Sequence, residues 1–126
     1  MANAVLPRNS TRQAEMWLVG DVARLLHRLC GTVILLFVLV HVVVQSIVHV
    51  PAWEGLRQSM PWLHALQNQN WVHAILYFSV AFHSLHGLRL MLGDLGFQFD
   101  YRRSLWITTG VSALFALREI VRYAGI

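Results

Sequence analysis

The sequence contains no lysine, a single cysteine and few acidic residues. Its ten basic residues are all arginines, against six Asp and Glu, so the formal net charge of +4 rests on arginine alone. A single cysteine, Cys30, excludes an intrachain disulfide and an iron–sulfur cluster held by cysteines of this chain. Because Cys30 lies in an apolar run, we interpret it as a small packing residue.

The signatures of a soluble catalytic domain are also missing. There is no glycine-rich phosphate loop and no nucleophile motif, and 126 residues leave no room for a flavin or nucleotide fold beside membrane spans. The arginines flank apolar runs and form no stripe, which argues against nucleic-acid binding. Only 13% of the residues are charged, whereas 56% are hydrophobic, and the mean hydropathy is +0.51. This composition places the chain among membrane proteins.

Three apolar runs are long enough to cross a bilayer, which needs about 20 residues. They predict an all-α integral membrane protein, a single membrane-anchor domain over residues 1–126, with spans at 29–50, 72–92 and 105–123. Residues 1–24 have no continuous apolar core, so they do not form a cleavable secretory signal. We expect them to form a short N-terminal surface segment on the cytoplasmic side, with one amphipathic turn before the first span.

The arginines are distributed unevenly between the two ends of these spans. Three spans place the N-terminal flank on the same side as the turn between the second and third spans, and seven of the ten arginines lie there. These seven are Arg8, Arg12, Arg24, Arg28, Arg89, Arg102 and Arg103. The positive-inside rule therefore predicts a cytoplasmic N-terminus in the cytoplasmic (inner) membrane of a bacterium. The opposite loop, 51–70, is rich in tryptophan, which favours the membrane interface, and Pro61 is expected to begin a short surface helix there.

The second span contains ionisable side chains, which are costly in a bilayer and indicate a functional site by default. At about 100° per residue, His83 shares a face with Gly87 and Asp94, and His86 lies slightly to the side. A neutral imidazole binds haem iron, and a glycine one turn away would leave room for a flat porphyrin. The alternative is that His83 forms a hydrogen bond between helices, and for a single histidine on its own this alternative is favoured.

The first span has a polar stripe of its own. His27, Gly31, Val38 and His41 fall close to one face, and Gln45 follows one turn later. Polar groups at this depth are expected to face protein and not lipid.

The second-span pattern resembles a known family. The spacing His83-x-x-x-Gly87-x-Arg89-x-x-x-x-Asp94 is similar to the second membrane helix of the cytochrome b membrane-anchor subunit of succinate dehydrogenase or fumarate reductase, respiratory complex II.

A second motif of the same family opens the first span as His27-Arg28-Leu29-Cys30-Gly31. Both motifs occur in the family's order, and the resemblance covers roughly residues 24–103. One position departs from the pattern, because the family often has a serine where this chain has Arg24. Any hydroxyl contact with a quinone would then come from elsewhere, such as the partner anchor.

The resemblance implies one subunit of a four-part enzyme: a flavoprotein, an iron–sulfur protein and two small membrane anchors in the lipid bilayer. Succinate would be oxidised at the flavin of another chain, and electrons would pass through iron–sulfur clusters to a quinone, either ubiquinone or menaquinone. This chain would help to bind the quinone and attach the soluble subunits to the membrane, and alone it is not expected to be catalytic. The alternatives are a haem b anchor of another quinone-linked dehydrogenase and a haem-free structural membrane subunit.

The resemblance also implies roles for individual residues. In the family the His-Arg pair lies beside the quinone headgroup and the haem propionates, which assigns quinone binding to His27 and Arg28. A guanidinium stabilises the negative charge that develops on quinone oxygens, and an imidazole could hold or pass a proton. His83 is implied as an axial ligand to haem iron, and Arg89 as a propionate contact. Asp94 matches an aspartate that helps to anchor the iron–sulfur subunit or relay protons, and a plain helix-end charge is an equal alternative.

The number of haem b groups, one or two, is open. Two-haem relatives have a distal-haem ligand at about the position of His41, where single-haem members generally have an apolar residue. Depths estimated from helix rise do not decide whether His41 and His83 are level and share one iron. We expect a second haem with His41 as an axial ligand and Arg118 or Arg122 near its propionates. The alternative is that His41 forms a hydrogen bond between helices.

Overall fold

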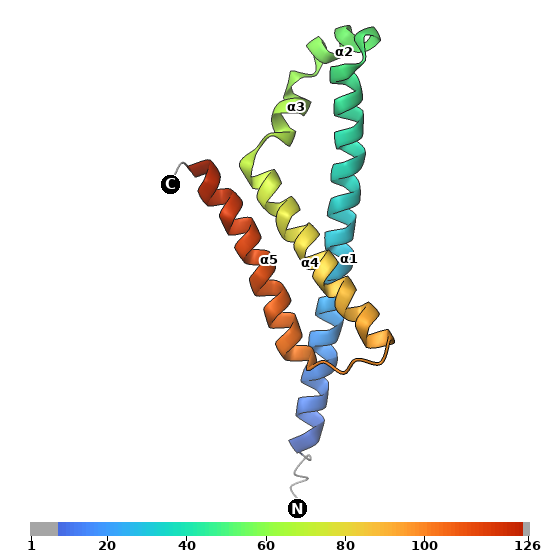
Figure 1. Ribbon diagram of the computed structural model, residues 1–126, viewed down its shortest axis with the longest axis vertical. Coiled ribbons are helices and arrows are strands. Elements are labelled where there is room, and N and C mark those ends of the chain that lie inside the picture. Colours follow the sequence, from blue (N-terminus) through green and yellow to red (C-terminus); the bar gives the residue numbers. More distant parts are fainter. Residues whose placement is uncertain (1–7, 125–126) are drawn as a thin grey trace, which may run out of the picture.

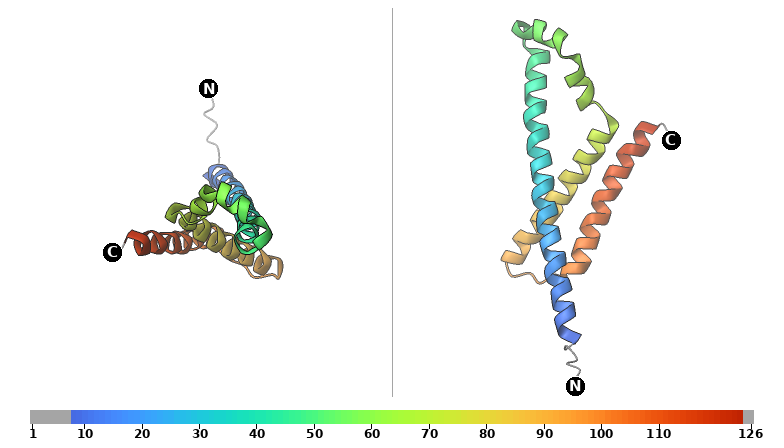
Figure 2. Two further views of the ribbon diagram at one scale, coloured as in Figure 1. Left: turned by 90° about the horizontal axis from the view of Figure 1, so that it is seen from above. Right: turned by 180° about the vertical axis from the view of Figure 1, so that it is seen from behind.

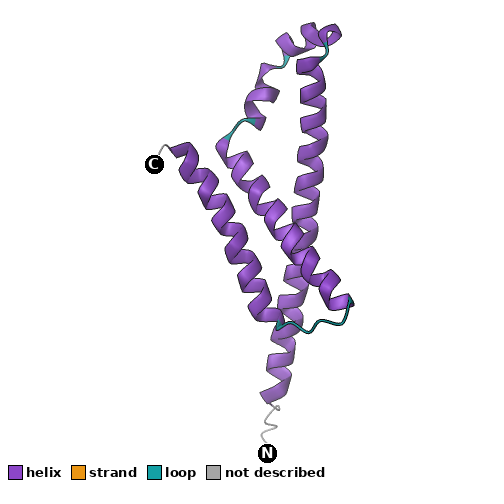
Figure 3. Cartoon of the chain, viewed as in Figure 1, coloured by secondary structure: helices purple, strands orange, loops and turns teal. Residues whose placement is uncertain are grey.

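The computed structural model describes residues 8–124, which are helical apart from short connections (Figures 1 and 3). The elements are α1 (Arg8–His49), a 3-10 turn η1 (Pro51–Trp53), α2 (Glu54–Ser59), α3 (Pro61–Gln67), α4 (Asn70–Asp94) and α5 (Tyr101–Ala124). Three helical segments are long and apolar enough to span a membrane: Trp17–His49 within α1, and the whole of α4 and α5. The described residues contain no strand, so the prediction of an all-α protein with three membrane helices is confirmed.

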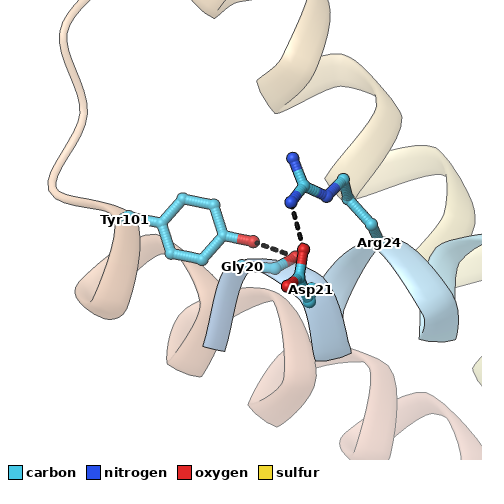
Figure 4. Close-up of polar contacts among 4 residues, drawn as sticks. All are labelled: Gly20, Asp21, Arg24 and Tyr101. Carbon is cyan, nitrogen blue, oxygen red and sulfur yellow. Dashed lines mark hydrogen bonds and ion pairs between the residues drawn. The ribbon is translucent and has the colours of Figure 1, made fainter. Parts of the chain in front are cut away.

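The N-terminal part of the chain is more helical than the sequence suggests. Helix α1 runs without a break from Arg8 into the first span, so the expected surface segment continues into the same helix as the span. The physical reason is that no proline lies between Pro7 and Pro51. Gly20 alone costs about 1 kcal/mol of helix propensity, which a helix of 42 residues tolerates. An ion pair between Asp21 and Arg24 also links adjacent turns just after Gly20 (Figure 4).

The connection between α1 and α4 consists of short helices near the end of α1. Pro51 opens η1, and Pro61 occupies the first turn of α3, as the sequence predicts. Within α2, Glu54 accepts hydrogen bonds from Arg57 at 2.6 Å and Gln58 at 3.3 Å. The Arg57 contact, followed by the Gln58 contact, holds the pKa of the Glu54 carboxyl below its ordinary value.

Local capping explains the short turn between α4 and α5. Gly96 has a positive φ of 93°, and the Phe97 N–H donates to the Leu92 carbonyl at 3.1 Å, which is the six-to-one bond of a Schellman motif. Asp100 then caps α5, because its Oδ1 accepts the Arg102 N–H at 3.1 Å. The C-terminal cap of α4 and the N-terminal cap of α5 lie within a few residues of each other, and the chain reverses between them. Helix α5 therefore runs antiparallel beside α4 (Figures 1 and 2).

Small side chains line the contacts between the helices. Cys30 of α1 lies beside Ser79 of α4, and both are under 5% exposed, so the interpretation of Cys30 as a packing residue agrees with the structure. On α5, Ser112 is fully buried and its hydroxyl donates to the Thr108 carbonyl at 2.7 Å. Small residues allow backbones to approach closely, which is how membrane helices associate. The close approach fixes where side chains of α1 and α4 meet.

Helices α1 and α4 cross and then diverge toward the loop that contains α2 and α3 (Figure 2). The predicted polar stripe of α1 is therefore only partly covered by this chain. His27 and Gly31 lie at the crossing, whereas Val38 and His41 are exposed. The expectation that the whole stripe packs against protein is not met within the chain, because α4 leans away from α1 beyond Gly31.

Candidate functional site at the crossing of α1 and α4

Three histidines meet where α1 crosses α4. The ring of His27 lies parallel to that of His83, with 4.1 Å between centroids and 6° between planes. The ring of His86 lies 5.3 Å from His27 at an angle of 50°. The sequence places His27 and His83 in separate motifs, and the fold brings them into direct contact.

Two glycines lie at this contact, and each leaves space for the imidazole of the opposite helix. A Cβ on Gly31 would lie 2.9 Å from Cε1 and 3.1 Å from Nδ1 of His83. A Cβ on Gly87 would lie 3.4 Å from Cε1 of His27. The gap that the sequence suggests beside Gly87 is therefore filled by His27, and the glycine that accommodates His83 is Gly31. The rotation of each helix about its own axis decides this pairing.

A hydrogen bond fixes the orientation of His83. Its Nδ1 lies 3.1 Å from the backbone carbonyl oxygen of His27. A carbonyl can only accept, so Nδ1 carries the proton and Nε2 keeps its lone pair. Within the described residues Nε2 makes no hydrogen bond. Metal-ligating histidines commonly have this arrangement, in which a carbonyl orients the ring and the other nitrogen binds the metal.

His86 is a site residue to which the sequence analysis gave no role. It is fully buried, stacks on Phe82 at 5.5 Å, and neither of its ring nitrogens has a hydrogen-bond partner among the described residues. Burying a polar group without a partner is costly. The only signal in the sequence is that His86 lies three residues after His83. The burial of His86 depends on how α1 packs against α4.

Two arginines flank the histidines. Arg28 follows His27 and is exposed, so its guanidinium is available to a group outside this chain. Arg89 is partly buried, with its guanidinium carbon 4.1 Å from the centroid of the Tyr101 ring. Its Nε is buried and has no hydrogen-bond partner among the described residues. Asp94 is exposed at the last residue of α4 and forms no ion pair within the described part of the chain.

The other predicted residues lie away from this crossing. His41 is ten residues beyond Gly31 on α1, or ~15 Å along the helix, and stacks on Phe37 at 5.6 Å. His41 and His83 are therefore not level, so they cannot share one iron in this structure. Arg118 is exposed on α5, and Arg122 is 3.7 Å from the buried Glu119. The ion pair with Glu119 is thus one reason why Arg122 can lie within the third span.

One family model matches most of the chain. The family described as succinate dehydrogenase/fumarate reductase transmembrane subunit matches residues 7–118. The chain belongs to this family. No curated protein and no solved structure matches the chain significantly.

The family match covers both motifs and the crossing of the two helices that contain them. The match includes α1, α4 and most of α5, so the histidine cluster lies inside the family region. A transmembrane subunit of succinate dehydrogenase or fumarate reductase is part of an enzyme complex with other subunits, and its three apolar helices make it a membrane protein.

Proposed function

We propose that this chain is the haem b-binding and quinone-binding membrane anchor of a succinate:quinone oxidoreductase. The observation that carries the proposal is the orientation of His83, whose Nδ1 bonds to the His27 carbonyl while Nε2 keeps its lone pair. The residues present fit a haem. Gly31 leaves the space that the His83 ring occupies, and Arg89 brings a positive charge with no acidic partner among the described side chains.

In this proposal His83 would hold the haem iron through Nε2, and Arg89 would pair with a propionate. The haem would supply a one-electron carrier between the iron–sulfur clusters and the far side of the membrane anchor. The hydrogen bond to the His27 carbonyl orients the imidazole and raises its basicity as a ligand. Any further ligand to the iron would come from the second anchor subunit.

His27 and Arg28 would bind the quinone headgroup. Arg28 is exposed beside the histidine cluster, and Nδ1 of His27 is buried with no partner among the described residues. A guanidinium and an imidazole N–H can both donate to quinone oxygens, and these bonds strengthen as negative charge develops on reduction. Arg24 takes the place of the family's usual serine, so we assign any hydroxyl donor to the partner anchor.

The remaining parts of the proposal concern the whole complex. The chain attaches the flavoprotein and iron–sulfur subunits to a bacterial cytoplasmic membrane with its N-terminus in the cytoplasm, and Asp94 lies on that side. Succinate-derived electrons reach the quinone, ubiquinone or menaquinone, through this anchor. His41 would hold a second haem b, and its separation of ~15 Å from Gly31 along α1 supports two irons at different depths. Arg118 would lie near the propionates of that second haem.

Purification of the tagged chain with its native partners tests this function. We expect a flavoprotein, an iron–sulfur protein and a second small membrane protein to co-purify, together with haem b and succinate-driven reduction of a quinone. A haem-free complex that still reduces quinone would support the structural-subunit alternative. Co-purification with a dehydrogenase for another substrate would contradict the succinate assignment.

A further inference from the structure

Among the arginines whose burial the structure describes, Arg89 is the only one that is partly buried, and it also differs in what its guanidinium contacts. Arg24, Arg57 and Arg122 each form an ion pair with an acidic residue three positions before them on the same helix. Arg89 instead has an aromatic ring against its guanidinium, and no carboxylate among the described residues pairs with it. A partly buried cation at a membrane helix end needs an anion or a π-system to offset its desolvation.

The ring under Arg89 is itself held in place. Tyr101 is the first residue of α5, and its hydroxyl donates to the Gly20 carbonyl of α1 at 3.4 Å (Figure 4). Asp100 caps the start of the same helix, which fixes the backbone from which the ring projects. A Cβ on Gly20 would lie 4.0 Å from the tyrosine oxygen, an ordinary packing distance, so the ring lies directly against the backbone of α1. Through Arg89 and Gly20, Tyr101 connects all three membrane helices.

We infer that Tyr101 is a positioning residue that holds the Arg89 guanidinium flat, so that its N–H edge is presented to a carboxylate bound at the crossing. This inference rests on the proposed function, in which that carboxylate is a haem propionate. A planar guanidinium can stack on an aromatic face and still donate from its edge, where carboxylates bind in two-pronged geometry. The acidic residues nearby do not compete, because Asp100 is engaged as a helix cap and Asp94 is exposed.

The test compares four variants in the intact complex: Tyr101→Leu, Tyr101→Phe, Arg89→Gln and, as a matched control, Tyr77→Leu on an exposed position of α4. One measurement is the rate at which phenylglyoxal modifies Arg89, followed by mass spectrometry. Loss of the ring should increase this rate about 2- to 5-fold in Tyr101→Leu, the range expected for loss of a cation–π contact. Tyr101→Phe keeps the ring and loses only the hydroxyl bond to the Gly20 carbonyl, so its labelling rate should lie between those of the wild type and Tyr101→Leu.

The second measurement is the haem midpoint potential, which a purely structural role of Tyr101 would not move. Removing the positive charge in Arg89→Gln should lower the potential, because a nearby cation favours the reduced and less positive iron. Tyr101→Leu should shift it in the same direction by a smaller amount, Tyr101→Phe should shift it less than Tyr101→Leu, and Tyr77→Leu should leave it unchanged.

The possible failures are distinguishable. Unchanged labelling of Arg89 in Tyr101→Leu would overturn the inference whatever the haem content. A potential that shifts in Arg89→Gln but not in Tyr101→Leu would also overturn it, while the bound haem leaves the proposed function standing. A complex that contains no haem contradicts the proposed function and removes the anion that the inference requires.

Discussion

Replacing Gly31 with alanine tests how closely α1 and α4 must approach at the histidine cluster. The new methyl group would lie 2.9 Å from Cε1 and 3.1 Å from Nδ1 of His83, well inside the 3.5–4.0 Å at which carbon atoms pack best. His83 cannot simply rotate away, because it is stacked on His27 and bonded to that residue's carbonyl. Either the two helices separate or the imidazole leaves its orientation.

The magnitude follows from two opposing effects. Alanine in place of glycine raises helix propensity by about 1 kcal/mol, whereas overpacking a contact costs about 1–3 kcal/mol. Gly110→Ala is the matched control, because a Cβ there meets nothing within 4 Å. We therefore expect Gly31→Ala to be about 1–3 kcal/mol less stable than Gly110→Ala. Gly87→Ala, with its contact at 3.4 Å, should lie between them.

Thermal unfolding of the purified complex, followed by circular dichroism and by haem absorbance, measures both consequences. Gly31→Ala should unfold at a lower temperature than Gly110→Ala and show an altered low-spin haem spectrum. If both variants have the same unfolding temperature and an unchanged spectrum, the close approach of His83 to Gly31 is refuted.

Three further predictions use other parts of the chain. Arg28→Leu should depress succinate–quinone turnover much more than succinate oxidation by a soluble artificial acceptor, since only the quinone reaction needs the exposed guanidinium; equal losses would indicate an assembly defect. The intact complex should have a haem-to-flavin ratio near two that falls to one in His41→Ala, because His41 and His83 lie at different heights; a wild-type ratio near one would exclude the second haem. Asp100→Ala should destabilise the complex by about 1 kcal/mol through loss of the α5 cap, as read from its thermal unfolding, and an unchanged midpoint would show that the cap bond contributes nothing.

The sequence predicts the helical architecture well because length and hydropathy decide it. The three apolar runs all became helices, and Pro61 begins α3 as expected. Polar composition indicated a surface segment before the first span, and the structure adds that this segment is helical and continuous with the span, because no proline interrupts the chain between Pro7 and Pro51. Composition indicates where a chain meets lipid, and breakers and caps determine where a helix begins.

The sequence points to some residues of the histidine cluster and not to the geometry that brings them together. His83 and its motif could be found from spacing, and the pairing of Gly31 with His83 could not, because the rotation of each helix depends on packing. The sequence did not indicate a role for Tyr101, because its contact with Arg89 depends on the turn between α4 and α5 that Gly96 and Asp100 shape. The sequence shows His86 as a second histidine of the same span, but its complete burial depends on how α1 packs against α4.

The most direct test of the account is the reduced-minus-oxidised spectrum of the complex in His83→Ala beside His86→Ala. Both variants remove a histidine from the same cluster on α4, and only His83 has a ring orientation fixed by a carbonyl with Nε2 left as the binding nitrogen. The account predicts that His83→Ala loses the low-spin haem b signal of that site while the complex still assembles, and that His86→Ala keeps it. An unchanged spectrum in an assembled His83→Ala complex, or loss of the signal only in His86→Ala, would contradict it.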